Sequence, residues 1–342
     1  MYRNIQNIRK RHKVEFFDKC DLYSSNLKTL RGEQLCIYDS IDNKNGRIAV
    51  FGTMENLADL SNSDVLIADG TFKVTPNEFY QLYIVHGRIF LKILPLVYIL
   101  TENKLQTSYE MFLKILKDQP DFKFPKNIVI DFELAAYKAF QNIANESNVY
   151  FCLFHFGQCV WRKIQKLGLT KLYTSNLLFR LYMKCYLSLA FVPVESVNDE
   201  YAKLIAEGKT LFPETDMEEF FNYFQSTFLT ELYPITSWNA RFRIFNNMPL
   251  TTNSAECFNK IFTSRFDQNH SGIHTFVEKL KAQQSLVEQD IETLMLNPAS
   301  YKQSNTTVEK YTRIKEICEN YPMYRGTTFL RAIAKAYNWK LK

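Results

Sequence analysis

Val65-Leu66-Ile67-Ala68-Asp69 is an apolar run that ends on an aspartate, and Ile128-Val129-Ile130-Asp131 repeats the pattern further along the chain. Short aliphatic runs of this kind predict buried strands. Much later, Asn253-Ser254-Ala255-Glu256 adds a carboxylate on an expected helix. Carboxylates held rigidly by separate elements are what a pair of divalent metal ions needs in phosphoryl-transfer chemistry. The pattern therefore indicates phosphodiester chemistry, although an aspartate after an apolar strand is more commonly a turn or cap residue.

The bulk composition is compatible with this interpretation. The chain has 342 residues, 46% hydrophobic and 15% aromatic, which is enough for one elaborated domain or two. A net charge of +6 permits nucleic-acid binding without demanding it. Seven irregularly spaced cysteines predict reduced thiols. Residues 1–4 begin no apolar signal run, and the longest apolar stretch, 89–100, is interrupted by Lys92 and Pro95. We therefore expect a soluble, intracellular protein that does not cross a membrane.

The chain is expected to begin with a basic N-terminal arm, residues 1–31, that carries Arg9-Lys10-Arg11-His12-Lys13. The arm is either a solvated terminus or a short nuclear-localisation or phosphate-contacting patch. After it, strand and helix patterns alternate. Strands are predicted at 35–38, 47–51, 65–69, 79–84, 89–100, 128–131 and 149–153, and helices at 107–117 and 133–144. This order predicts a mixed α/β sheet.

The pattern changes at about residue 155, and 155–248 shows almost no strand signal. Helical periodicity predicts an all-helical block there. Thr251 or Thr252 can cap the helix that carries Glu256, and Thr275 can cap a long helix after it. If the three carboxylates meet, the block is an insertion in a core made of 32–154 and 249–298, followed by a helical C-terminal tail, 299–342.

Several motifs in the chain resemble those of a known family. Ile67-Ala68-Asp69-Gly70-Thr71-Phe72-Lys73-Val74, followed by Phe79-Tyr80-Gln81-Leu82-Tyr83, resembles the opening motif of the MULE (Mutator-like element) transposase domain. Asp131-Phe132-Glu133-Leu134-Ala135 and Cys152-Leu153-Phe154-His155-Phe156-Gly157-Gln158 are similar to its second and third blocks. The stretch from Thr251 to Asn259 resembles the late block with the third acidic residue. Ile37-Tyr38-Asp39-Ser40 and Val50-Phe51-Gly52-Thr53 resemble the lead-in of animal members associated with FLYWCH zinc fingers.

The resemblance, which runs from about residue 30 to 290, implies a fold, a site and a reaction. The fold is an RNase H-like mixed five-stranded sheet with helices on both faces, interrupted by an all-helical insertion. Asp69, Asp131 and Glu256 would be the catalytic, metal-binding triad of a DDE transposase that uses two Mg²⁺ or Mn²⁺ ions. The reaction would be nicking at transposon terminal inverted repeats, followed by strand transfer into target DNA. The implied localisation is the nucleus, and a homo-oligomer is compatible with the family.

The Cys152-x-x-His155 pair is a family hallmark with more than one interpretation. A zinc site with Cys159, one turn further on, would need a fourth ligand that the sequence does not name. Alternatively, His155 lies near DNA or the carboxylates, and Cys152 is a buried thiol. Arg162, on the helical face of His155, is either a phosphate contact or a solvated arginine. Trp238 either stacks on an unpaired base or packs in a core.

His270 and His274 have metal-like spacing, but Ser271-Gly272 between them indicates a loop instead of a metal site. Two other functions stay open beside the transposase. One is a host-retained or truncated relic that binds DNA or protein without catalysis, because no zinc-finger pattern accompanies the core. The other is a helical interaction scaffold, which explains 155–248 but not the aspartates at the strand ends.

Overall fold

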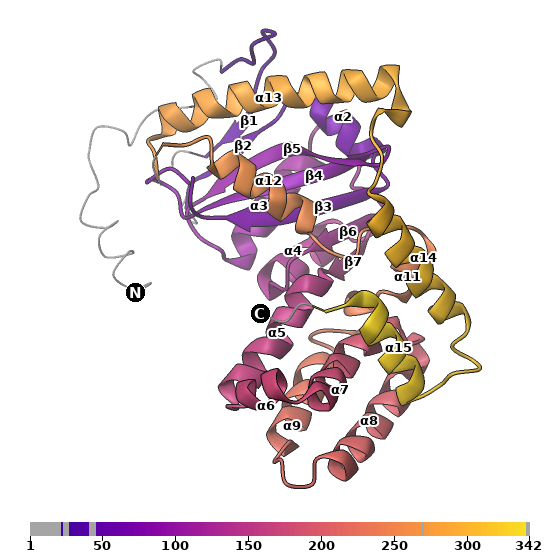
Figure 1. Ribbon diagram of the computed structural model, residues 1–342. Helices are drawn as coiled ribbons and strands as arrows, with labels where there is room; N and C mark the ends of the chain where they lie inside the picture. Colours follow the sequence, from indigo (N-terminus) through magenta and orange to yellow (C-terminus); the bar gives the residue numbers. More distant parts are fainter. Residues whose placement is uncertain (1–21, 23–26, 41–45, 268–269, 340–342) are drawn as a thin grey trace. The chain divides into compact units, whose positions relative to one another are not determined.

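The computed structural model describes residues 22, 27–40, 46–267 and 270–339. The chain divides into two compact units, which are described separately below (Figure 1). Unit 1 consists of Met1–Asn148 and Asn253–Lys302, and unit 2 consists of Val149–Thr252 and Gln303–Lys342. Most of the predicted basic arm lies outside the described residues. The limits predicted for the core, the insertion and the tail stay predictions.

The described residues form a seven-stranded sheet with the order β1-β2-β5-β4-β3-β6-β7. Neighbouring strands from β1 to β3 pair antiparallel, and β3 pairs parallel with β6. The strands are β1 (Cys36–Asp39), β2 (Ile48–Phe51), β3 (Val65–Thr71), β4 (Gln81–Ile89), β5 (Lys92–Thr101), β6 (Asn127–Ile130) and β7 (Asn148–Phe151).

The α/β class is confirmed, but the expected count of five strands is wrong. All four residues of β2 are buried, because β2 pairs with β5 on one side and with β1 on the other. These two strands extend the sheet beyond β5. The residue pattern predicts both of them, so the error comes from the strand count that the family resemblance implied.

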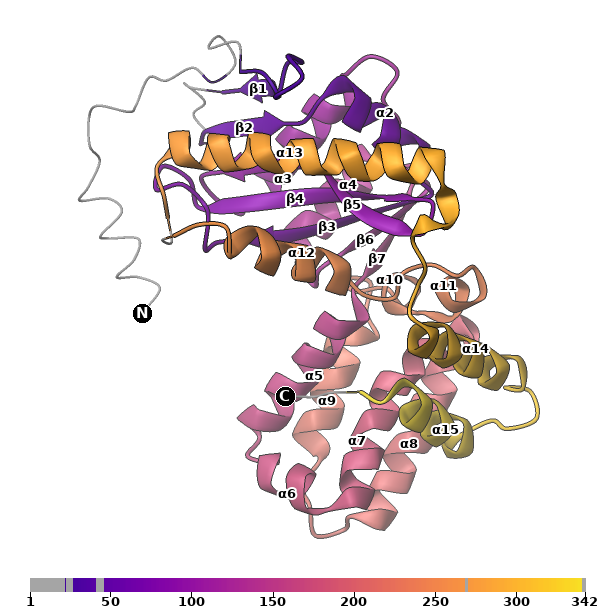
Figure 2. The same ribbon diagram turned by 45° about the horizontal axis from the view of Figure 1, so that its top comes forward.

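Helices cover both faces of the sheet in unit 1 (Figures 1 and 2). Alternation along β4 explains why, since successive side chains of a strand point to opposite faces. Tyr83 contacts the rings of Tyr109 and Phe112 on one face, while Leu82 and Ile84 join a cluster with Phe276 on the other. The first face carries α3 (Gln106–Lys117), against which α4 (Leu134–Ile143) packs, and the second carries α12 (Asn253–Thr263) and α13 (Ile273–Leu296).

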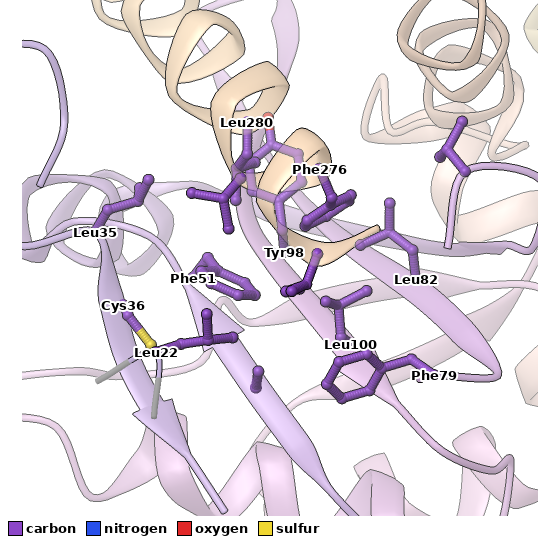
Figure 3. Close-up of a cluster of buried hydrophobic side chains, with 14 of the residues drawn as sticks. Leu22, Leu35, Cys36, Phe51, Phe79, Leu82, Tyr98, Leu100, Phe276 and Leu280 are labelled. Atoms are coloured by element: carbon purple, nitrogen blue, oxygen red, sulfur yellow. The ribbon is translucent and has the colours of Figure 1, made fainter. Parts of the chain in front are cut away.

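The cluster under α13 is the main apolar core of this face (Figure 3). Phe51 and Leu100 from the sheet point toward Phe276 and Leu280 from the helix. Burial of such side chains contributes roughly 1.5–3 kcal/mol each, so it fixes α13 and the preceding α12 on the sheet. A shorter helix, α2 (Met54–Asn62), packs against β4 and β5 and is capped by Thr53.

Unit 2 is helical after β7. Its aromatic core is dense: the ring of Tyr186 contacts Phe220 and Phe224, and Phe156 stacks on Trp238. Near its end, α15 packs against α7. The helices are α5 (Leu153–Lys166), α6 (Thr170–Ser175), α7 (Leu177–Ser188), α8 (Val197–Leu211), α9 (Glu218–Phe228), α10 (Ile235–Trp238), α11 (Arg241–Phe245), α14 (Asn305–Glu319) and α15 (Thr327–Tyr337).

None of the helices in the described part of the chain combines the length and apolar character that crossing a membrane requires.

Candidate active site

Asp69 lies in β3, directly after the fully buried Ile67 and Ala68. Its side chain is itself largely buried, with 6% exposure of the residue. Asn259 of α12 donates from Nδ2 to Asp69 Oδ2 at 2.8 Å. An ionised carboxylate is costly to bury unless hydrogen bonds compensate for lost hydration, so this contact holds Asp69 in one orientation. The aspartate is therefore on the face of the sheet that α12 covers.

Asp131 follows β6, the strand that runs parallel beside β3. The last pair of the register is Ala68 with Ile130, and Asp69 and Asp131 are the residues that follow them. Neighbouring strands lie about 4.8 Å apart, so the two backbone positions are close. Asp69 lies two residues before the carboxyl end of β3, and Asp131 directly follows β6.

Glu256 is in the first turn of α12, where the helix dipole favours a carboxylate. Aromatic contacts fix this helix on the sheet: Phe258 meets the His86 ring at 5.5 Å, and Phe262 meets the Tyr98 ring at 6.1 Å. Glu256 lies three residues before Asn259, and residues three apart share a helix face. Glu256 is therefore one turn away from the side chain that binds Asp69.

The three carboxylates suit Mg²⁺ or Mn²⁺ chemically, because both ions prefer hard oxygen ligands. Their side chains do not yet form a closed site. In the ranges that the structure describes, no three His, Cys, Asp or Glu side chains lie close enough together to hold a metal ion. The register brings the positions of Asp69 and Asp131 close together, and Glu256 lies one helical turn from the partner of Asp69, so a metal site made of all three would require side-chain rotation.

A polar network on the opposite face of the sheet was missed by sequence reasoning. Tyr109 of α3 donates to Glu133 Oε1 at 3.0 Å, and Gln81 Nε2 of β4 donates to the Tyr109 hydroxyl at 3.3 Å. Lys104 Nζ lies 2.8 Å from Glu133 Oε2. Gln81 and Glu133 both lie in the family-like motifs, close along the chain to Asp69 and Asp131. That closeness in sequence is the signal that could have identified them as site residues.

Burial, together with the negative charges of these carboxylates, raises the pKa values of two tyrosines. Burial raises the pKa of Tyr83 well above its usual value, and the charges of Asp131, Glu133 and Asp69 raise it further. Burial likewise raises the pKa of Tyr109, with a further rise caused by Glu133. Both hydroxyls therefore stay protonated and can act only as neutral groups beside the carboxylates.

Cys152, His155 and Arg162 belong to unit 2. Cys152 precedes α5 and is fully buried, and its Sγ accepts hydrogen bonds from the backbone N (3.2 Å) and hydroxyl (3.4 Å) of Thr252. Burial raises the pKa of Cys159 to about 11, which disfavours a thiolate ligand. The burial of Cys152 and its two contacts with Thr252 support the buried-thiol interpretation.

The other residues expected to contact nucleic acid differ in exposure. His155 is half-buried, with its ring 5.5 Å from that of Phe154, and Arg162 is exposed on α5. Trp238 is fully buried, and its Nε1 donates to the carbonyl of Phe228 at 2.9 Å. Its burial supports core packing over base stacking. Both interpretations of Arg162 stay open.

His270 lies in the loop before α13, and His274 is in the first turn of that helix. The backbone N of His270 donates to the carbonyl of Lys73, and its Nδ1 lies 3.1 Å from the carbonyl oxygen of Thr75. His270 has a φ of 56°, a left-handed conformation that is typical of tight loops. The contacts agree with the predicted loop role.

Comparison with known proteins identifies a family. Residues 65–158 match the model of the MULE transposase domain, a segment that includes Asp69, Asp131 and the Cys152–His155 pair but ends before Glu256. Among curated proteins, none matches the chain. The resemblance noted from the motifs is thereby confirmed for this segment, and the FLYWCH association stays a prediction.

Proposed function

We propose that this chain, whose residues 65–158 match the MULE transposase domain, is a DNA transposase catalytic domain that cleaves DNA and transfers strands. The family match supports a transposase-related function in general. The finer proposal assigns catalysis to Asp69, Asp131 and Glu256 with Mg²⁺ or Mn²⁺. The observation that carries it is the register of β3 and β6, which brings the positions of Asp69 and Asp131 close together, with Asp69 bonded to Asn259 on the helix that bears Glu256.

In this proposal each side chain has a defined task. Asp69, Asp131 and Glu256 would hold the metal ions, which in two-metal sites activate the attacking oxygen and stabilise the leaving oxygen. Asn259 orients the Asp69 carboxylate through its 2.8 Å hydrogen bond. Burial of Asp69 lowers the local dielectric and strengthens the interaction of this carboxylate with a cation.

The proposed partners are transposon terminal inverted repeats and target DNA, encountered in the nucleus. A net charge of +6 favours association with a polyanion. In unit 2, the exposed Arg162 is the proposed phosphate contact and the half-buried His155 a second one. A homo-oligomer would allow two DNA ends to be held at once.

The test is cleavage of supercoiled plasmid DNA in Mn²⁺ or Mg²⁺ by the full chain. Asp69→Asn, Asp131→Asn and Glu256→Gln should each lower the rate by at least about 100-fold, as loss of one transition-state-stabilising group does in other enzymes. Asp64→Asn is the matched control, because Asp64 immediately precedes β3 at its opposite end and pairs with Arg88. The control should cleave at the wild-type rate. Equal cleavage by all four variants would sink the assignment.

A second function, DNA binding by a relic without catalysis, is favoured by one observation. The carboxylates form no ready metal-binding group among the described residues. This function predicts salt-sensitive binding of a duplex that does not depend on added metal, with no strand breaks. Binding in the presence of EDTA, measured beside the cleavage assay, separates the two functions.

A further inference from the structure

Glu133 stands two residues after Asp131, at the position that caps α4, but its side chain does not cap that helix. Instead it accepts hydrogen bonds from Tyr109 at 3.0 Å and from Lys104 at 2.8 Å. Tyr109 is 2% exposed, so the bond to its hydroxyl is shielded from water. The carboxylate of Glu133 therefore binds side chains from other parts of unit 1 instead of capping its own helix, α4.

The first connection from Glu133 leads back to Asp69. Gln81 donates to the Tyr109 hydroxyl at 3.3 Å and also lies against Gly70, the residue after Asp69. A Cβ atom at Gly70 would come within 2.8 Å of Gln81 Nε2, so the amide packs directly on the backbone there. A continuous series of contacts thus joins the segment after Asp69 to the segment after Asp131.

A second connection joins the same two segments. Lys104 Nζ, paired with Glu133, lies 4.8 Å from the ring centre of Phe72, which is three residues after Asp69. Such a cation–π contact is attractive because the positive charge lies over the electron-rich face of the ring. Since the two connections use different side chains, Glu133 is held from two directions.

We infer that Glu133 is a positioning residue: through Tyr109 and Lys104 it fixes the segment after β6 relative to the segment after β3, and so sets the separation of Asp69 and Asp131. The inference rests on the proposed metal-dependent function. Mg²⁺ accepts little deviation from octahedral geometry, and loss of a partner that orients a ligand typically weakens metal binding about 10–100-fold. Glu133 itself is assigned no contact with metal or DNA.

The experiment measures Mn²⁺ binding by the full-length protein without DNA, by electron paramagnetic resonance titration, alongside the thermal unfolding midpoint. Tyr109→Phe and Glu133→Gln should each raise the Kd for Mn²⁺ by about 10-fold or more. Lys104→Met changes a partly exposed side chain and should give a smaller increase. It provides a test that does not depend on a core substitution.

Glu110→Gln is the matched control. Glu110 neighbours Tyr109 on α3 and accepts a hydrogen bond from Asn142 of α4 at 2.7 Å, so it links the same two helices without reaching the strand ends. Its Kd for Mn²⁺ should equal that of the wild type. A merely structural role of Glu133 would lower the unfolding midpoint and leave the Kd unchanged, which would overturn the inference.

Asp69→Asn separates this inference from the proposed function. If Asp69→Asn abolishes Mn²⁺ binding while Tyr109→Phe, Glu133→Gln and Lys104→Met bind as tightly as the wild type, the positioning role is wrong and the function stands. If the wild type binds no Mn²⁺, or Asp69→Asn binds it unchanged, both the function and the positioning role fail.

Discussion

Two buried side chains of unit 2 differ in their partners from two side chains beside the candidate site of unit 1. In unit 2, Trp238 donates to the carbonyl of Phe228, and Tyr201 donates to that of Phe221 at 2.7 Å, although Tyr321 donates to the carboxylate of Glu200 at 3.2 Å. In unit 1, near the ends of β3 and β6, the partners are carboxylates: Asn259 donates to Asp69, and Tyr109 donates to Glu133.

This difference distinguishes polar side chains that stabilise the fold from polar side chains that serve the proposed site. A donor bonded to a backbone carbonyl satisfies a buried group and joins two helices. A donor bonded to a carboxylate orients a negative charge and stabilises its ionised form. We therefore expect substitutions in unit 2 to change stability, and substitutions around the strand ends of unit 1 to change metal binding.

The largest stability effect is expected from Trp238→Ala in unit 2. Trp238 is fully buried and stacks on Phe156 at 5.2 Å, so truncation leaves a cavity and an unpaired carbonyl. The free energy of unfolding should fall by about 3–5 kcal/mol, measured by urea titration.

Trp238→Phe keeps most of the ring and sharpens the same test. Its affinity for single-stranded DNA should equal that of the wild type. A variant of normal stability with weaker single-stranded DNA binding would revive base stacking and contradict the comparison.

Much of the fold could be predicted from the sequence because local patterns decide it. Both apolar runs that end on aspartate are strands, and the strands predicted at 35–38 and 47–51 correspond to β1 and β2. What the sequence could not supply is the register of β3 against β6, since strand order follows from long-range packing and not from propensity.

The candidate site was predictable only in part for the same reason. Asp69, Asp131 and Glu256 stood out because a carboxylate after a strand or in a named motif is visible in the sequence. Asn259 was not, because its role depends on a contact across 190 positions of the chain. Glu133 was quoted in a motif, but its partners on α3 appear only once the sheet is assembled.

His86 offers the next test, because it is a buried polar group of unit 1 that faces an aromatic ring instead of a carboxylate. Burial lowers its pKa to about 4 from the ordinary 6.5, and backbone groups of Ile67 and Ile84 oppose this shift. The unfolded chain binds more protons than the folded one between these values. Stability is therefore fully present above pH 6.5, and falls by about 3 kcal/mol as the pH drops to 4.

His86→Leu should remove this part of the pH dependence, as measured by urea unfolding between pH 7 and 4. His274→Gln is the control, because His274 is exposed at the start of α13. The control should keep the wild-type slope. If His86→Leu keeps it too, His86 is not the group that titrates.

A pair of glycine substitutions has the smallest expected effects and tests the comparison of the two units most directly. In unit 2, a Cβ at Gly208 would lie 1.9 Å from the hydroxyl of Tyr182, which is 1% exposed and cannot move aside. Gly208→Ala should therefore lower stability by about 1–3 kcal/mol, although alanine favours a helix. Tyr182→Leu removes the clashing atoms, so the penalty of Gly208→Ala should shrink in that background.

In unit 1, a Cβ at Gly70 would lie 2.8 Å from the terminal amide nitrogen of Gln81 and 3.5 Å from Tyr83 Cδ2. Gly70→Ala should lower the free energy of unfolding by only about 1 kcal/mol, since the end of one side chain has to shift and alanine suits a strand better than glycine does. It should nevertheless weaken Mn²⁺ binding, because Gln81 leads through Tyr109 to Glu133. If both alanine variants lose stability and neither loses metal affinity, polarity around the strand ends of unit 1 is structural, as it is in unit 2.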